Sequence, residues 1–134
     1  MRKFFLLAAF GLAACAQPGA PLTCTAPLKP ALELGLYFGL DIEGGGVVSE
    51  AQWAQFVADE VTPRFPDGLS VLNVAGQSRT SMNQMLRERT KLMVVVVFDM
   101  PSHRAKADAI IAAYGKRFGQ NNVFRTEHSV CAGV

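Results

Sequence analysis

The chain has 134 residues, with 13 Lys and Arg against 11 Asp and Glu, which gives a formal net charge of +2 at neutral pH. Half of the residues are hydrophobic, and a chain of this size is expected to bury one core and not two. The near balance of charge excludes proteins that depend on a strongly basic surface, nucleic-acid-binding proteins above all.

The start of the chain predicts export. Arg2 and Lys3 precede an apolar run over residues 4–14, which is too short to span a membrane, because a spanning helix needs roughly 20 residues. A short apolar run behind two cations is typical of a secretory signal. The Leu-Ala-Ala sequence before Cys15 resembles the lipobox of bacterial lipoproteins, in which the cysteine is acylated and becomes the first mature residue. Ordinary cleavage after Ala16 is the alternative interpretation.

The predicted organisation is a lipoprotein signal over residues 1–15, a Pro-rich tether over 16–30 and a single domain over 31–134. By the same resemblance, a residue other than Asp after the cysteine favours anchoring in the outer membrane, facing the periplasm. Loss of Arg2 and Lys3 with the signal takes the thirteen basic residues to eleven, equal to the acidic residues. We therefore expect the protein to bind the membrane through its acyl chains and not through its charge.

The three cysteines predict one disulfide. If Cys15 carries lipid, Cys24 and Cys131 remain as a pair in an oxidising compartment. A disulfide that closes a loop of about 107 positions is expected to stabilise the fold by roughly 4 to 5 kcal/mol. Two separate buried thiols are the alternative. A metal site is not predicted, because the chain has two histidines and no Cys-x-x-Cys spacing.

The first half of the domain predicts a strand followed by a helix. Apolar residues alternate with others over residues 32–39, which indicates a strand with one packed face. Three glycines over 44–46 predict a turn. Ser49 followed by Gln52 predicts a capping box at the start of a helix, which Thr62-Pro63 is expected to end.

The second half predicts two strands, a helix and a last strand. Residues 69–75 indicate the second strand, and the polar residues 77–88 are expected to form a mobile loop, because they are too many for a tight hairpin. Residues 92–98 include four consecutive valines and predict a strand covered on both faces at the centre of the sheet. A helix is expected after Pro101, with Gly119 as its left-handed C-cap, and the last strand over 123–131.

This order of elements predicts an α+β, ferredoxin-like β-α-β-β-α-β fold. Its four-stranded antiparallel sheet has the strand order 4-1-3-2, with two helices on one face. The third strand then lies inside the sheet, as its valines require. The last strand runs antiparallel beside the first, so Cys24 and Cys131 are expected at the same end of the sheet.

Several short blocks are distinctive in combination. They are Leu-Tyr-Phe-Gly at 36–39, Val-Ser-Glu-Ala-Gln-Trp at 48–53 with Phe56, residues 59–68, Gly76-Gln77, Arg-Glu-Arg at 87–89, Tyr114, residues 117–120 and Val123. Together they resemble a bacterial family of small secreted proteins and lipoproteins, domain of unknown function 3574. The most specific block is Thr-Pro-Arg-Phe-Pro-Asp-Gly at 62–68, and the chain departs from the family at Ser78, where tryptophan is more common. The resemblance implies no established activity.

The predicted scaffold separates the polar residues into two groups. One end of the sheet holds Asp41, Glu43, Gln77, Arg79, Arg87 and Gln120, and the other holds Arg64, Asp67, Asp99 and His103. In the first group, Gln77, Arg79, Arg87 and Gln120 could bind a small anionic or sugar-like ligand, because arginine offers a planar fork to carboxylate or phosphate. A solvated loop is the alternative. Arg64 and Asp67 either stabilise their proline-containing turn or bind a ligand.

Two hypotheses about function follow from these expectations. The first is a non-catalytic envelope lipoprotein that binds a second copy, an envelope protein or a small ligand through its open sheet face, with Glu33, Tyr37, Arg125 and Glu127 on that face. The second is a dimeric α/β-barrel enzyme with Tyr37 and His128 as acid–base groups. The predicted strand phases oppose the second hypothesis, since they place His128 and Phe124 toward the core. No catalytic motif is present, and we predict no catalytic residue, metal or cofactor.

Overall fold

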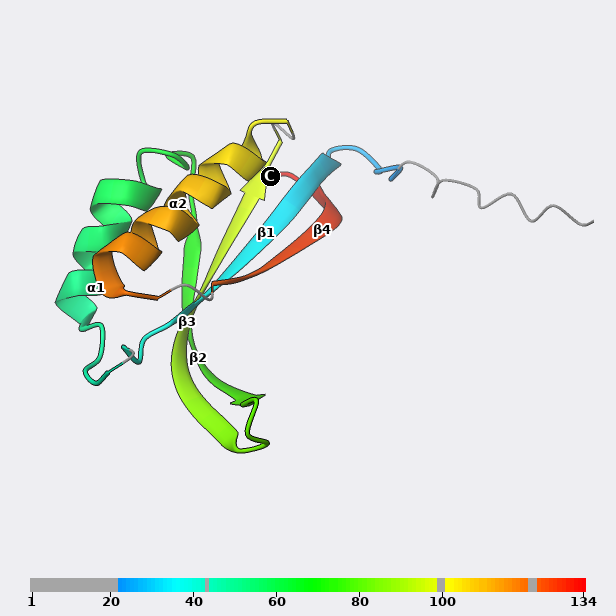
Figure 1. Ribbon diagram of the computed structural model, residues 1–134. Helices are drawn as coiled ribbons and strands as arrows, with labels where there is room; N and C mark the ends of the chain where they lie inside the picture. The colour runs from blue at the N-terminus through cyan, green and yellow to red at the C-terminus, as the bar shows by residue number, and fades with distance from the viewer. Residues whose placement is uncertain (1–21, 43, 99–100, 121–122) are drawn as a thin grey trace, which may run out of the picture.

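A computed structural model describes residues 22–42, 44–98, 101–120 and 123–134 (Figure 1). Residues 1–15 with Cys15, as well as Glu43 and Asp99, lie outside this described part. The elements are strands β1 (Lys29–Gly39), β2 (Ser70–Arg79), β3 (Met85–Val97) and β4 (Phe124–Ala132), and helices α1 (Glu50–Phe56), η1 (Val57–Val61) and α2 (His103–Phe118).

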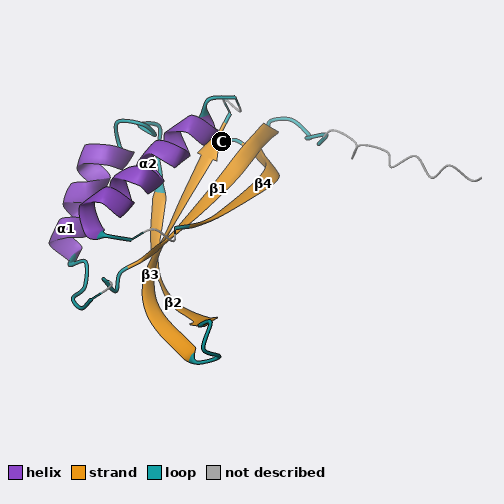
Figure 2. Ribbon diagram, in the orientation of Figure 1, coloured by secondary structure: helices purple, strands orange, loops and turns teal. Residues whose placement is uncertain are grey.

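The strands form one antiparallel sheet in the order β2-β3-β1-β4, and the helices cover one of its faces (Figure 2). This arrangement confirms the predicted ferredoxin-like topology, and β3 lies inside the sheet as its valines indicated. The prediction that both faces of this strand are covered is wrong, because the helices cover one face and Val96 is 39% exposed on the other. In the described part of the chain, no helix has both the length and the apolar character that crossing a membrane requires.

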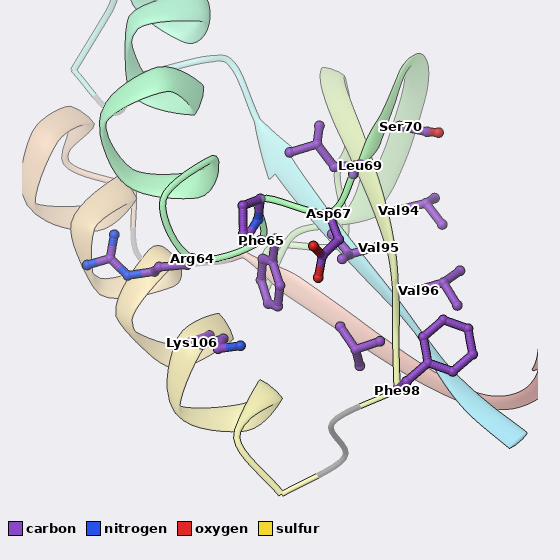
Figure 3. A pocket seen from close by; sticks show the side chains of 13 residues that line it. Arg64, Phe65, Asp67, Leu69, Ser70, Val94, Val95, Val96, Phe98 and Lys106 are labelled. Carbon is purple, nitrogen blue, oxygen red and sulfur yellow. The ribbon is translucent and has the colours of Figure 1, made fainter.

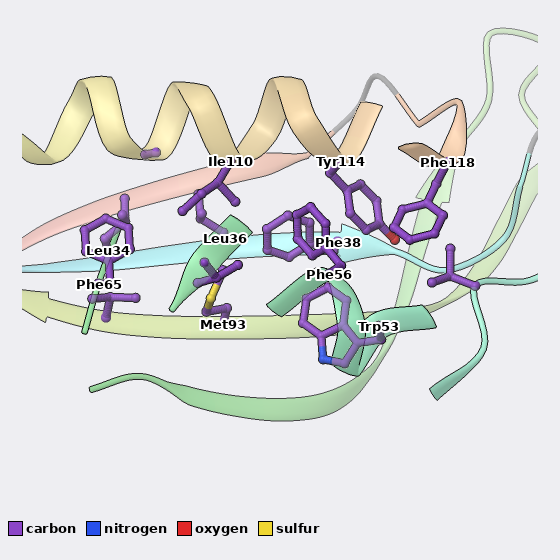
Figure 4. Close-up of a cluster of buried hydrophobic side chains, with 14 of the residues drawn as sticks. Leu34, Leu36, Phe38, Trp53, Phe56, Phe65, Met93, Ile110, Tyr114 and Phe118 are labelled. Carbon is purple, nitrogen blue, oxygen red and sulfur yellow. The ribbon is translucent and has the colours of Figure 1, made fainter. Parts of the chain in front are cut away.

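The core lies between the sheet and the helices. Strand β1 alternates as predicted, and its side chains Leu34, Leu36 and Phe38 are fully buried. Phe38 packs edge-on against Trp53 and Tyr114, with ring centroids 5.1 and 4.8 Å apart (Figure 4). The hydroxyl of Tyr114 donates a hydrogen bond of 2.7 Å to the carbonyl of Gly39, so this buried polar atom has a partner.

Local signals start and end the helices where the sequence indicated. The Ser49 side chain accepts a hydrogen bond from the Gln52 amide, and the Gln52 side chain accepts one from the Ser49 amide, which confirms the capping box. The helix continues as the π-helix η1, in which the Thr62 amide donates to the Val57 carbonyl at 2.9 Å. Gly119 ends α2 with φ 69°, the left-handed conformation predicted for it.

The predicted mobile loop over residues 77–88 is wrong. Strands β2 and β3 pair continuously from Ser70↔Val94 to Arg79↔Met85, and a short turn joins them. In this turn Asn83 has φ 62°, and the Thr80 amide donates to the Gln84 carbonyl at 2.9 Å. The hairpin extends beyond the helices (Figure 1), so solvent reaches both of its faces and the sequence shows no apolar alternation.

The predicted phase of β4 is also wrong. Phe124 pairs with Tyr37 and His128 pairs with Glu33, so both lie on the sheet face opposite the helices. Arg125 and Glu127 instead face α2, where they contact Asp108 at 2.8 Å and Arg104 at 3.3 Å. Their ion pairs with helix α2 take the place of apolar packing at this edge of the sheet, which is why hydrophobicity assigned the wrong face.

The ends of the domain are joined as predicted. Cys24 and Cys131 form a disulfide, with their Cα atoms 5.6 Å apart. Strand β1 begins at Lys29, inside the predicted tether, because Lys29 and Pro30 pair with the end of β4. The disulfide and this pairing therefore attach residues 24–30 to the sheet.

Candidate functional site

The face of the sheet opposite the helices has no layer over it in the described part of the chain (Figure 2). Register and strand alternation assign the following residues to this open sheet face: Glu33, Tyr37, Ser70, Leu72, Val74, Leu92, Val94, Val96, Phe124, Thr126, His128 and Val130. All four strands contribute to it. Most of these side chains are apolar or aromatic, and the polar ones are Glu33, Ser70, Thr126 and His128.

Large apolar side chains on this face are exposed to solvent. Phe124 is 66% exposed, Leu72 47% and Val96 39%. The rings of Tyr37 and Phe124 lie side by side, with centroids 5.7 Å apart. Isolated exposed apolar residues are ordinary on a protein surface, but a contiguous set over four strands is typical of an interaction surface.

Titratable side chains on the open sheet face include Glu33, Tyr37 and His128. Glu33 and His128 are directly opposite each other on neighbouring strands, and Tyr37 lies on the same face of β1. The phase of β4 therefore removes the objection that sequence reasoning raised against Tyr37 and His128 acting together. The two glycines of β1 do not leave its backbone bare, since Thr126 lies over Gly35 and Glu88 lies over Gly39.

The four residues predicted to bind an anionic or sugar-like ligand lie at separate places. Gln77 and Arg87 pair across the hairpin, and Arg79 donates to the Asn83 side chain at its tip, at 2.6 Å. Gln120 instead donates to the Asp41 carbonyl at the base of the hairpin.

The base of the hairpin carries its own charged group. Arg89 contacts the Asp41 carboxylate at 3.4 Å. Burial raises the pKa of Glu88 above its ordinary value, and the negative charge of Asp41 raises this pKa further, against a hydrogen bond with the Asp41 main chain that lowers it.

Arg64 and Asp67 flank a turn at the other end of the sheet. Arg64 donates to the main-chain carbonyl of Glu60 and to its carboxylate, the latter at 2.9 Å, which is the type of contact expected of a structural residue. Asp67 is exposed and makes no ion pair with any described residue. Its carboxylate points into a groove beside β3 (Figure 3).

We call this hollow the edge groove. Its volume is about 680 Å³, and it lies between the loop that leads into β2 and the last residues of β3. Its lining comprises residues 64–70, residues 94–98 and Lys106. Phe65 is almost fully buried in its wall, and the Lys106 ammonium lies 5.7 Å from the centre of the Phe65 ring. Sequence reasoning found Arg64 and Asp67 but not the groove.

A charged cluster lies between β4 and α2. His103 is buried, and its Nε2 atom is 3.4 Å from Oε1 of Glu127. Burial raises the pKa of Glu127, but the hydrogen bond and charge of Arg104, with the charges of His103 and Arg125, lower it below its ordinary value overall. Among the described residues, no three His, Cys, Asp or Glu side chains are grouped so that they could hold a metal ion.

Comparison with known proteins identifies a family and a fold. The model of a family described as protein of unknown function (DUF3574) matches residues 33–133. No protein of curated function matches the chain in sequence. A phage SAM lyase in complex with S-methyl-5'-thioadenosine is similar in structure, with a TM-score of 0.58, 13% identity, and coverage of 76% of this chain and 90% of the lyase.

CutA proteins are also similar in structure. CutA from Synechococcus elongatus superimposes with a TM-score of 0.52 and 11% identity, over 79% of this chain and 84% of CutA. CutA1 from Oryza sativa has a TM-score of 0.52 and 6% identity, over 80% and 85% of the two chains. At these identities the similarity shows a shared fold.

Proposed function

The chain belongs to the DUF3574 family, whose description gives no activity, and we therefore propose a function from its surface. We propose that it is a non-catalytic binding domain of the bacterial envelope, anchored in the outer membrane through lipid on Cys15. The open sheet face is the binding surface, and its occupant is a second copy of this chain. The contiguous apolar surface over four strands carries this proposal.

The size of the face supports self-association. The strands contribute unequal lengths to this face: β1 pairs with β4 over nine positions and with β3 over eight, and β2 lies beside five of these eight. At about 3.4 Å per residue and about 4.8 Å between strands, the face measures roughly 500 Å². Two such faces packed together would bury roughly 1,000 Å² in total, about the lower limit for a specific interface. Two sheets pack face to face in this way in β-sandwiches, with interdigitated side chains between them.

The lipid anchor can be tested by labelling. In a bacterium that expresses the full chain, we expect radioactive palmitate to label the protein and the membrane fraction to contain it. Cys15→Ala should lose both the label and the membrane association. The matched control is Cys24→Ala with Cys131→Ala, which should keep the label. Membrane association that survives Cys15→Ala would contradict the anchor.

Self-association can be tested with the Cys15→Ala chain by sedimentation equilibrium. Leu72→Glu and Phe124→Glu place charge on exposed positions of the open sheet face and should weaken dimerisation at least tenfold. Ala112→Glu is the matched control, because Ala112 is exposed on α2, a helix on the opposite face of the sheet. A monomer at all concentrations, or an equal effect of the control, would refute the proposed occupant.

A second candidate is an enzyme with its pocket on the open sheet face, enclosed by two copies. The observation that favours it is the shared face of Glu33, Tyr37 and His128, since a carboxylate, an imidazole and a phenol can act in general acid–base chemistry. The similar phage lyase binds S-methyl-5'-thioadenosine, which supplies a probe. We expect this compound to raise the melting temperature, and Tyr37→Phe or His128→Gln to abolish the shift. No shift in the unmodified chain would count against this candidate.

A further inference from the structure

The edge groove exists because β3 extends three residues past the position that pairs with the first residue of β2. The first residue of β2, Ser70, pairs with Val94, whereas β3 continues to Val97. On its other side β3 remains paired with β1 as far as Val97, which lies opposite Leu32. The end of β3 is therefore a strand with one free edge, and that edge forms one side of the groove (Figure 3).

The hydrogen-bond phase of β3 directs main-chain groups into this groove. The amide of Leu40, the residue that follows β1, donates to the Arg89 carbonyl of β3 at 2.9 Å. Hydrogen-bonded pairs recur at every second residue of an antiparallel ladder, so the odd-numbered residues of β3 bond to β1. Even-numbered residues then bond toward β2, as Val94 does in its pair with Ser70. The next such residue, Val96, has no β2 partner, and among the described residues none outside the strands bonds to its main chain.

The other walls supply apolar surface and three charged side chains, the carboxylate of Asp67 and the cations of Arg64 and Lys106. The Lys106 ammonium lies over the Phe65 ring. Phe65 and Leu69 line the loop side of the groove, and Phe98, 55% exposed, lies at its open end. The Asp67 carboxylate points inward from the loop and forms no ion pair with any described residue (Figure 3). Arg64, in contrast, is already neutralised by Glu60 at 2.9 Å.

We propose that the edge groove binds an extended peptide segment of a partner protein, which adds to the free edge of β3 at Val96 and places a basic side chain against Asp67. Strand addition satisfies the free amide and carbonyl of Val96, and the carboxylate of Asp67 selects the charge of the segment. From Val94 to Phe98 the edge is about 13 Å long, so it pairs with roughly four residues. The segment ends or turns away at Ser70, because β2 occupies the edge from there onward.

The groove is distinct from the proposed dimer surface. Side chains of Val94 and Val96 belong to the open sheet face, whereas the main chain of Val96 faces the groove. Binding of a peptide segment here does not require that a second copy cover the open face. The failure of one proposal therefore leaves the other standing.

Selection from a displayed library of random heptapeptides tests the proposal. The target is the full chain with Cys15→Ala, and the compared target carries Asp67→Lys in addition. We expect the first to enrich peptides with Lys or Arg among β-branched residues, and the second to enrich Asp or Glu at that position. Asp108→Asn is the control, because it removes an exposed carboxylate of α2 that is not part of the groove lining and should leave the selection unchanged.

A second variant tests the main-chain contact. Val96→Pro removes the amide that faces the groove and no bond to β1, so the sheet is expected to persist. A selected Lys peptide should bind this variant at least tenfold more weakly, and Asp67→Asn about three- to fivefold more weakly, as expected for one partly exposed ion pair. An N-methylated copy of the peptide should lose binding as Val96→Pro does.

Three outcomes would overturn the proposal. The first is an absence of enrichment on the unmodified groove. The second is enrichment that keeps the same charge preference on Asp67→Lys. The third is dimerisation that Val96→Pro or Asp67→Lys abolishes, which would identify a second copy as the occupant of the groove.

Discussion

Lys91 provides a stringent test of how this sheet is stabilised. Its side chain points from β3 toward the helices and is 4% exposed, yet it carries a charge. The ammonium donates to both carboxylate oxygens of Glu50, at 2.7 and 2.8 Å, and to the Asn73 side chain at 2.5 Å. The perturbation is Glu50→Gln, which removes the negative charge and keeps the size of the side chain.

The expected loss of stability depends on how differently the two side chains are buried. Breaking a fully buried ion pair by removing one partner costs about 3 to 5 kcal/mol. Glu50 is 77% exposed, so water replaces part of what the carboxylate provided, and Asn73 remains as an acceptor. A hydrogen bond to a charged group contributes about 1.5 to 3 kcal/mol, and we expect Glu50→Gln to lower the free energy of unfolding by that amount.

Urea denaturation followed by the fluorescence of the chain's single tryptophan, Trp53, measures this effect, because Trp53 lies in the core. Asp59→Asn is the control, since its pair with Arg117 is exposed and the change should cost less than about 1 kcal/mol. Lys91→Met combined with Glu50→Gln should recover most of the lost stability, because no charge then remains buried. A stability of Glu50→Gln within about 0.5 kcal/mol of the unmodified chain would refute the reasoning.

Three further predictions concern stability. Cys24→Ser with Cys131→Ser should lower the free energy of unfolding by roughly 4 to 5 kcal/mol, because the disulfide closes a loop of 107 positions; equal urea midpoints with and without reductant would contradict this. Tyr114→Phe should cost about 1 to 2 kcal/mol, because the Gly39 carbonyl loses its buried donor; urea denaturation measures the difference. The lowered pKa of Glu127 contributes stability that is present above its ordinary value of 4.5 and is lost as the pH falls through the lower folded value. Glu127→Gln should flatten the stability profile in that acidic window, and an unchanged slope would exclude this contribution.

Strands that pack one face against the helices, and local contacts between residues near in sequence, could be predicted from the sequence. Strand β1 alternates because one of its faces packs on helices along its length, and the capping box at Ser49 is a local arrangement of neighbouring residues. The valines of β3 indicated an interior strand, and its place in the sheet order confirms this. The disulfide was predicted from two expectations, export to an oxidising compartment and antiparallel pairing of the first and last strands.

Features set by distant charges and by strand ends could not be predicted. Hydrophobicity placed Phe124 in the core, but the inward positions of β4 are held by the charges of Arg125 and Glu127 against α2. Asn73 likewise places a polar side chain on the helix side of β2, where it accepts a hydrogen bond from Lys91. The phase of β2 was therefore not readable from its apolar residues, and Leu72 was missed as part of the open sheet face. The edge groove depends on the register between Ser70 and Val94, which is a property of the folded sheet.

The two proposed surfaces meet at Val96 and can be separated there. Its side chain is 39% exposed on the open sheet face, and its main chain lines the edge groove. Val96→Glu should therefore weaken dimerisation and leave peptide binding nearly unchanged, whereas Val96→Pro should weaken peptide binding and have the smaller effect on dimerisation. For each variant, sedimentation equilibrium measures the dimer dissociation constant and peptide titration measures the affinity for the peptide. If each variant weakens both interactions equally, the open sheet face and the groove act as one surface, and the two separate proposals are wrong.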